Sequence, residues 1–240
     1  MFGVQIRQCG QRTGKLIAQH HPQCLNRHDP ASPATFGDMG LSAGMNSTGE
    51  DKSCGAWQDV PIMRQLLLLR HAKSSWDDAS MSDRDRPLNA RGRRSAATMR
   101  QAMRDLGLAP DVVLVSTARR TMETLETLEP WDDTPLVDPM ESLYLANPMQ
   151  MTAALHGVAE TVRSVLLIGH NPGMHDLALS LAGPGAMRGG GQNERALAEG
   201  FPTGALAEFV VAGSWWDLRE GSGRLVRFLT PRMLEGAGLS

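Results

Sequence analysis

The chain has 240 residues, enough for one domain of ordinary size with additional segments. Its net charge of −2, from 24 basic and 26 acidic residues, gives no general positive field for nucleic acid, and an aromatic content of 5% argues against a stacking surface for single strands. Hydrophobic residues make up 41%, yet no apolar run approaches the roughly 20 residues of a membrane span, so we expect a globular protein with no nucleic-acid or membrane partner.

The first 62 residues differ in composition from the rest. They are rich in Gly, Ser, Pro, Gln and His and show no sustained periodicity. Four basic residues precede the first acidic one, Asp29: Arg7, Arg12, Lys15 and Arg27. Three interpretations stay open, namely a disordered extension, a start codon placed upstream of Met63, and a targeting segment, which is typically basic and poor in acids. We predict a disordered extension over 1–62, a folded domain over 63–232 and a C-terminal tail over 233–240.

All cysteines lie in this first segment, at Cys9, Cys24 and Cys54. The rest of the chain has none, so we expect no disulfide framework and a cytoplasmic location. Cys9 and Cys24, with His20, His21 and His28 nearby, could suggest zinc. The cysteines are too far apart for the paired spacing of a zinc finger, so we predict no metal and no other cofactor.

Strands alternate with helices in the remainder. The run Leu66–Leu69 predicts a buried strand, and a helix follows from Asn89, a favourable N-cap residue, to Gly107. Val112–Val115 predicts a second buried strand, and the helix after it stops at Pro130.

The same alternation continues in the second half. Two Asn-Pro pairs read as an N-cap followed by proline at the first helical position: Asn147-Pro148 and Asn171-Pro172. Between them, Val165–Ile168 predicts a third buried strand. The glycine-rich stretch Gly183–Gly200 predicts an irregular surface loop.

Two further strands, Gly204–Val211 and Arg224–Leu229, are joined by a turn-rich link and predict an antiparallel edge. Strands that alternate with helices form a largely parallel sheet covered on both faces. The sequence therefore predicts a three-layer α/β/α sandwich with a mostly parallel central sheet and an antiparallel edge.

The three buried strands each lead into residues that can hold or attack a phosphoryl group. These residues are Arg70-His71, Ser116 through Arg119, and His170-Asn171. Because ligands bind beyond the carboxyl ends of the strands in open α/β sheets, we expect these side chains to meet at one edge. Arginine binds phosphate oxygens with a planar fork, and a neutral imidazole can attack phosphorus. The pattern predicts an anion site with a histidine nucleophile that requires no metal.

Each residue taken alone also has a plainer interpretation. Arg119 could merely pair with Glu123, four residues further along the same helix. The residues around His170 could form only a helix cap, and Glu141 could be a surface carboxylate rather than a proton donor. The joint pattern favours the phosphate site, because three strand ends supply compatible groups.

The motifs at these positions resemble the histidine phosphatase superfamily, and most of all its SixA-type branch of small phosphohistidine phosphatases. The similar segments lie between about Met63 and Pro231, and they are Leu66 to Lys73, Arg86-Pro87-Leu88-Asn89, Ser116 to Thr121, Glu141 to Tyr144, Gly169 to Gly173 and Phe201 to Ala205. There are two departures: Ala72 stands in place of the glycine of the commonest signature, and Thr117 stands where proline is frequent. The resemblance implies a phosphoglycerate mutase-like fold.

The resemblance also implies roles for the matched residues. His71 is expected to be the nucleophile that forms a phosphohistidine intermediate, and Arg70, Arg119 and His170 are expected to surround the phosphoryl group. Arg86 matches a further pocket arginine. Glu141 lies near the position of the proton donor used by phosphoester-cleaving relatives. Ser116 and Asn171, which belong to the same motifs, are expected to bind substrate.

We therefore predict a monomeric, metal-independent phosphatase that acts on phosphohistidine in a protein. One alternative is a small-molecule phosphomonoesterase, in which Glu141 or a loop carboxylate such as Asp78 must protonate the leaving group. The other is a catalytically weak module that binds phosphate or a phosphoprotein. A mutase is disfavoured, because the short chain offers little capping insertion.

Overall fold

The computed structural model describes residues 62–236 of the chain. The expected N-terminal extension, with its cysteines and its possible zinc cluster, lies outside the described residues, as do the last four residues.

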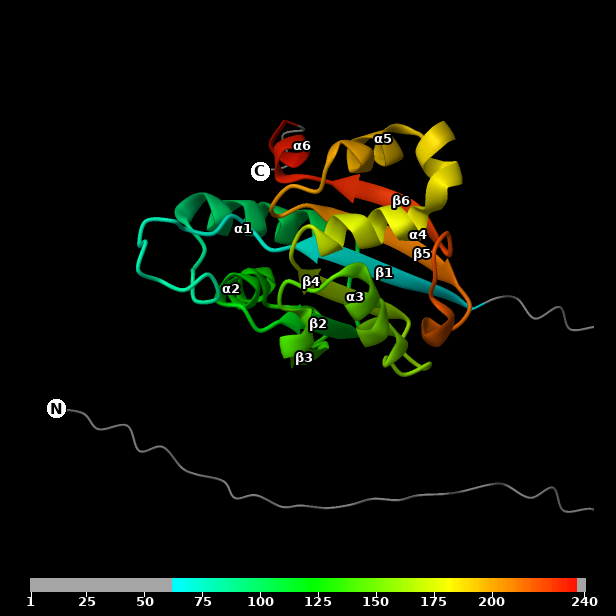
Figure 1. The fold of residues 1–240 in the computed structure, drawn as a ribbon, viewed down its shortest axis with the longest axis horizontal. Helices are drawn as coiled ribbons and strands as arrows, with labels where there is room; N and C mark the ends of the chain where they lie inside the picture. The colour runs from blue at the N-terminus through cyan, green and yellow to red at the C-terminus, as the bar shows by residue number, and fades with distance from the viewer. Residues whose placement is uncertain (1–61, 237–240) are drawn as a thin grey trace, which may run out of the picture. The chain divides into compact units, whose positions relative to one another are not determined.

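A six-stranded mixed sheet forms the centre of this region, in the order β3-β2-β4-β1-β5-β6 (Figure 1). The strands are β1 (Met63–Arg70), β2 (Val112–Ser116), β3 (Leu136–Met140), β4 (Ser164–Gly169), β5 (Leu206–Ala212) and β6 (Gly223–Leu229). Strands β3, β2, β4 and β1 pair in parallel, whereas β5 is antiparallel to β1 and β6 is antiparallel to β5. The predicted parallel sheet with an antiparallel edge is confirmed.

Helices cover both faces of the sheet, which confirms the three-layer sandwich (Figure 1). They are α1 (Ala90–Asp105), α2 (Arg119–Leu128), α3 (Pro148–His156), α4 (Gly173–Gly189), α5 (Gln192–Glu199) and α6 (Pro231–Gly236), with short 3-10 turns η1 (Glu141–Leu143) and η2 (Trp215–Asp217). Leu66 and Leu68 of β1 join the core with α3, α4 and α5, while Leu67 and Leu69 join the core with α1, α2 and α6. Successive strand residues face opposite sides, so a run of leucines fits a strand buried on both faces.

Strand β3 is not among the strands that the sequence predicts. It contains Pro139, which cannot donate a hydrogen bond to a sheet. The strand lies at the edge and pairs only with β2, and this is the position in which proline is tolerated.

The expected surface loop over Gly183–Gly200 is wrong. Gly183 adopts a left-handed conformation (φ +73°) and bends the chain, but Pro184 restarts the helix, and proline is well suited to a first helical turn. Helix α5 then follows and buries Leu197 in the core. The expected C-terminal tail is also corrected, because α6 continues to Gly236 with Leu234 in the other core cluster.

The N-caps predicted at Asn89 and Asn147 are present, but the one predicted at Asn171 is not. Asn89 accepts a hydrogen bond from the Gly92 amide, and Asn147 forms a reciprocal capping box with Gln150. Asn171 instead donates its side-chain amide to the carbonyl of Phe201, and α4 begins without a side-chain cap.

The start of α1 lies hard against the chain that follows β1. A Cβ placed on Gly92 would come within 2.1 Å of the Lys73 carbonyl oxygen, so only glycine allows this approach. The backbone amide of Asn89 donates to the same carbonyl at 3.0 Å. The segment after His71 is thereby fastened to the first turn of α1.

None of the helices described between residues 62 and 236 has the length and apolar character needed to cross a bilayer.

Candidate active site

A cavity of about 350 Å³ opens at the carboxyl ends of the parallel strands, where the sequence predicts the site. Its lining includes three arginines, two histidines, one carboxylate and one amide: Arg70, Arg86, Arg120, His71, His170, Asp83 and Asn171. The structure therefore brings together the ends of β1 and β4 with the start of α2 and the loop before α1.

His71 follows β1 directly and is held by its own neighbour. Its Nδ1 lies 2.8 Å from the carbonyl oxygen of Ala72. A carbonyl oxygen can only accept, so Nδ1 carries the proton and Nε2 keeps its lone pair. The ring is 7% exposed, which shields it from bulk water while one edge lines the cavity. This is the tautomer that a nucleophilic Nε2 requires.

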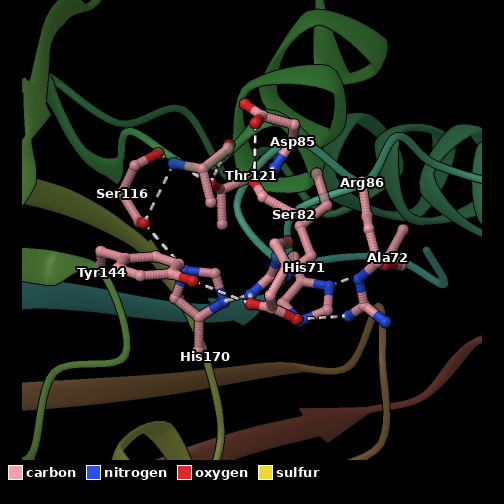
Figure 2. A network of polar contacts seen from close by, with 12 residues as sticks. His71, Ala72, Ser82, Asp85, Arg86, Ser116, Thr121, Tyr144 and His170 are labelled. Carbon is pink, nitrogen blue, oxygen red and sulfur yellow. Dashed lines mark hydrogen bonds and ion pairs between the residues drawn. The ribbon is translucent and has the colours of Figure 1, made fainter. Parts of the chain in front are cut away.

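His170, at the end of β4, is fixed by two partners (Figure 2). Nη2 of Arg120 lies 3.2 Å from Nδ1, and the Oγ of Ser116 lies 2.8 Å from Nε2. A guanidinium can only donate, so Nδ1 accepts and Nε2–H donates to Ser116. Ser116 is fully buried and is not among the cavity-lining residues, so the structure places its hydroxyl against His170 and not at the expected substrate-binding position.

The two histidine rings lie close together, with centroids 5.1 Å apart. Burial lowers the pKa of His71 to about 3, and the positive charges of the cavity arginines act in the same direction. Burial, followed by the neighbouring His71 and Arg120, lowers the pKa of His170 to about 3. Both imidazoles are therefore neutral near pH 7 in the free protein.

The structure does not bring Arg119 to the cavity. Its side chain is 53% exposed and pairs with Glu123 at 2.7 Å, which is the plainer of the two interpretations of the sequence. Arg120, the next residue, has a side chain that is 3% exposed and reaches both Asp83 and His170. Neighbouring helical residues point about 100° apart, so one step along α2 decides which arginine faces the site. The expected position of Arg119 is corrected to Arg120.

Glu141 also lies outside the set of cavity-lining residues. Its side chain is 61% exposed, pairs with Arg84 and accepts a hydrogen bond from Thr117 at 2.7 Å. The hydrogen bonds from Arg84 and Thr117 lower the pKa of Glu141. The structure therefore does not bring Glu141 into the cavity, where a proton donor is expected, and an ionised carboxylate paired with an arginine is a poor acid.

Arg70, Arg86 and Asn171 are where the sequence places them, on the cavity wall. The carbonyl of Phe201 accepts from Nη1 of Arg70 at 2.8 Å and from Nδ2 of Asn171 at 3.0 Å. The guanidinium of Arg86 lies over the ring of Trp76, with Cζ 3.4 Å from the centroid. Positive charge is thus concentrated on a small surface that suits an anion.

Sequence reasoning missed two contributors. Asp83 lines the cavity and pairs with Arg86 and Arg120. Tyr144 packs edge-on against His170, with ring centroids 5.6 Å apart (Figure 2). The hydroxyl of Tyr144 donates a hydrogen bond to Asp83. Asp83 lies in an irregular loop with no periodic pattern. Tyr144 is the only tyrosine of the chain, but this fact alone predicts no role for it.

Across residues 62–236, no group of three or more His, Cys, Asp or Glu side chains is arranged to hold a metal ion.

Comparisons with known proteins show the family to which this chain belongs. A model of the histidine phosphatase superfamily (branch 1) matches residues 66–139. An uncharacterized protein of Mycobacterium tuberculosis is 37% identical over 164 residues, which are 68% of this chain and 100% of that protein. A chloroplastic uncharacterized protein of Arabidopsis thaliana is 36% identical over 132 residues, which are 51% of this chain but only 61% of that protein.

Three solved structures share the fold. A proposed phosphohistidine phosphatase SixA from Nakamurella multipartitia has a TM-score of 0.62 and 28% identity and covers 70% of this chain and 96% of its own. Its counterpart from Agrobacterium tumefaciens has a TM-score of 0.59 and 29% identity, with coverages of 70% and 98%. The protein histidine phosphatase SixA complexed with tungstate has a TM-score of 0.57 and 25% identity, with coverages of 71% and 99%.

The lowered pKa values predict a loss of stability in mild acid. Between about pH 3 and pH 6.5 the unfolded chain protonates His71 and His170, whereas the folded protein keeps them neutral. The unfolded state then binds more protons, so the free energy of unfolding should fall as the pH is lowered, by about 2 kcal/mol per histidine from pH 7 to pH 5. Urea titrations at both pH values measure this, and His71→Asn should lose about 2 kcal/mol less than the wild type. Equal losses in the two proteins would contradict the assignment.

Proposed function

Because the chain belongs to the histidine phosphatase superfamily, we propose that it hydrolyses phosphohistidine in a protein, through a phosphorylated His71 and without a metal ion. The observation that carries the proposal is the composition of the cavity: a neutral histidine with a free Nε2 faces three arginines, and Asp83 is the one carboxylate among the described lining residues. The arginines supply the positive charge that a metal supplies in other phosphatases.

The chemistry follows from these groups in two steps. Nε2 of His71 attacks phosphorus, and the bond between phosphorus and the substrate ring nitrogen breaks. The substrate ring, already protonated on its other nitrogen, departs as a neutral imidazole. Water then attacks the phosphorus on His71, inorganic phosphate leaves, and Nε2 regains its lone pair. Arg70, Arg86 and Arg120 are placed to bind the phosphoryl oxygens in both steps.

The leaving group separates this proposal from a small-molecule phosphomonoesterase. An alkoxide must be protonated as it departs, and this needs a carboxylic acid near the site. Glu141 is paired with Arg84 outside the cavity lining, and Asp83 is paired with two arginines within it. Phosphohistidine needs no such donor. The likeness to structures described as phosphohistidine phosphatases, one of them with tungstate, an oxyanion like phosphate, points the same way. A cytoplasmic location and a monomeric state stay predictions.

A comparison of substrates tests the proposal. We expect kcat/KM on a phosphohistidine-bearing carrier protein to exceed that on sugar and glycerate phosphates by at least about 10²-fold, the low end of what general acid catalysis contributes. The reverse preference would identify a phosphomonoesterase. Phosphate binding with no turnover of either class would identify a binding module.

His71→Ala should abolish turnover, because no other group in the cavity presents a free imidazole nitrogen. During turnover the wild type should carry an acid-labile, alkali-stable phosphoryl group that mass spectrometry assigns to His71. His156→Ala is the matched control, since His156 lies at the end of α3 and contacts the Leu218 carbonyl, away from the cavity. Full activity in verified His71→Ala protein would rule out the mechanism.

Adjacent arginines provide an internal comparison. Arg120→Lys should lower kcat/KM by about 10²-fold or more, because it removes a cavity guanidinium that also holds His170. Arg119→Lys should change kcat/KM by less than about threefold, because its exposed pair with Glu123 contributes little. A larger loss in Arg119→Lys than in Arg120→Lys would return the role to Arg119.

A further inference from the structure

Asp83 occupies the arginines that a phosphoryl group needs. Its Oδ1 lies 2.9 Å from Nη2 of Arg86, and its Oδ2 lies 3.0 Å from Nη2 of Arg120. The hydroxyl of Tyr144 donates to the same Oδ2 at 2.9 Å. A planar anion that bridges two guanidinium groups and accepts a further hydrogen bond makes the contacts that a bound phosphoryl group makes.

The other nitrogen atoms of the Arg86 guanidinium have no partner among the residues that the structure describes. In the described structure, Nε and Nη1 of Arg86 are buried and have no hydrogen-bond partner. Asp83 therefore satisfies the guanidinium of Arg86 only in part.

The carboxylate can leave this position while its backbone stays in place. Arg120 donates through Nη1 to the backbone carbonyl of Asp83, and the amide of Arg119 donates to the carbonyl of Arg84 at 3.0 Å. The loop backbone is thus fastened to the first turn of α2. The Asp83 side chain is 46% exposed, so a rotamer change is enough to move the carboxylate into water.

We propose that Asp83 is an internal competitor of the phosphoryl group, which neutralises Arg86 and Arg120 in the empty site, yields them to the substrate, and takes them back as phosphate leaves. The inference rests on the proposed function in so far as the ligand is a phosphoryl group. Partial burial alone would raise the pKa of Asp83, but the Tyr144 hydrogen bond and the charges of Arg120 and Arg86 hold it below its usual range, so the competitor is ionised.

Competition has a cost for binding and a benefit for turnover. Each phosphoryl ligand must displace two ion pairs, so affinity is lower than the arginines alone would give. The same carboxylate lowers the affinity for inorganic phosphate, the last product to leave. A merely positioning carboxylate would have the opposite effect, because its loss would leave the two arginines misplaced and weaken binding.

The test is calorimetric titration of inorganic phosphate into the full chain at fixed ionic strength and neutral pH. Asp83→Asn should bind phosphate about three- to tenfold more tightly than the wild type, the range expected for two partly exposed ion pairs. Asp83→Ser should also bind more tightly, so the result does not depend on the folding of one variant. Asp83→Glu keeps the charge and should show no gain.

Asp85→Asn is the matched control. It removes the same charge two residues away in the same loop, where the side chain accepts from the Ser82 hydroxyl at 2.6 Å and does not line the cavity. Its phosphate affinity should stay within about twofold of the wild type, since a change in net charge alone acts weakly through solvent.

Three outcomes would overturn the inference, and they are distinct from failure of the proposed function. Equal or weaker phosphate binding by Asp83→Asn and Asp83→Ser makes Asp83 a positioning residue, and an equal gain in Asp85→Asn makes the effect one of general charge. If neither the wild type nor any variant binds phosphate, the competitor inference fails, and the turnover comparison decides the proposed function separately. Tighter phosphate binding without turnover of phosphohistidine would leave the competitor standing and remove only the proposed substrate.

Discussion

The hydrogen bond between Nδ1 of His71 and the carbonyl oxygen of Ala72 fixes the state of the ring on which the chemistry depends. It places the proton on one nitrogen and leaves the other free, and it does so with backbone, which cannot rotate away. The backbone is itself rigid here, because β1 lies inside the sheet between β4 and β5 and buries leucines on both faces (Figure 1). The orientation of a single ring thus follows from the central strand of the fold.

The same small volume must also hold several cations. Arg70, Arg86 and Arg120 share one cavity with two imidazoles, and a protonated imidazole would add to their mutual repulsion. The structure relieves this in two ways: both histidines stay neutral, and Asp83 pairs with two of the arginines. An anion that enters reverses the balance, since it brings the negative charge that the cavity lacks. Under the proposed competition, an empty site and a loaded site differ in the ion pairs that Arg86 and Arg120 make.

Much of this arrangement could be predicted from the sequence, because strand ends are a strong signal. Apolar runs of strand length that end in Arg-His or Gly-His place those residues at one sheet edge, and the structure agrees. The sequence could not decide which of Arg119 and Arg120 faces the cavity, because this depends on the residue at which α2 begins. Glu123 also lies four residues after Arg119, which is the spacing of an ion pair within a helix. The position of Asp83 could not be predicted, because its partner Arg120 is 37 residues away and its loop has no periodic sequence pattern. The loop predicted over Gly183–Gly200 is wrong, because Pro184 restarts the helix directly after the bend at Gly183.

The carbonyl oxygen of Phe201 accepts hydrogen bonds from two parts of the chain that are synthesised at different times. It accepts hydrogen bonds from Arg70 at the end of β1 and from Asn171 just after β4, and it lies in the segment between α5 and β5. A nascent chain on the ribosome already contains both histidines and all three cavity arginines once residue 171 has been added, yet it lacks the acceptor that holds Arg70 in place. The contacts that hold Arg70 are therefore complete only when the segment that precedes β5, late in the sequence of the domain, is in place.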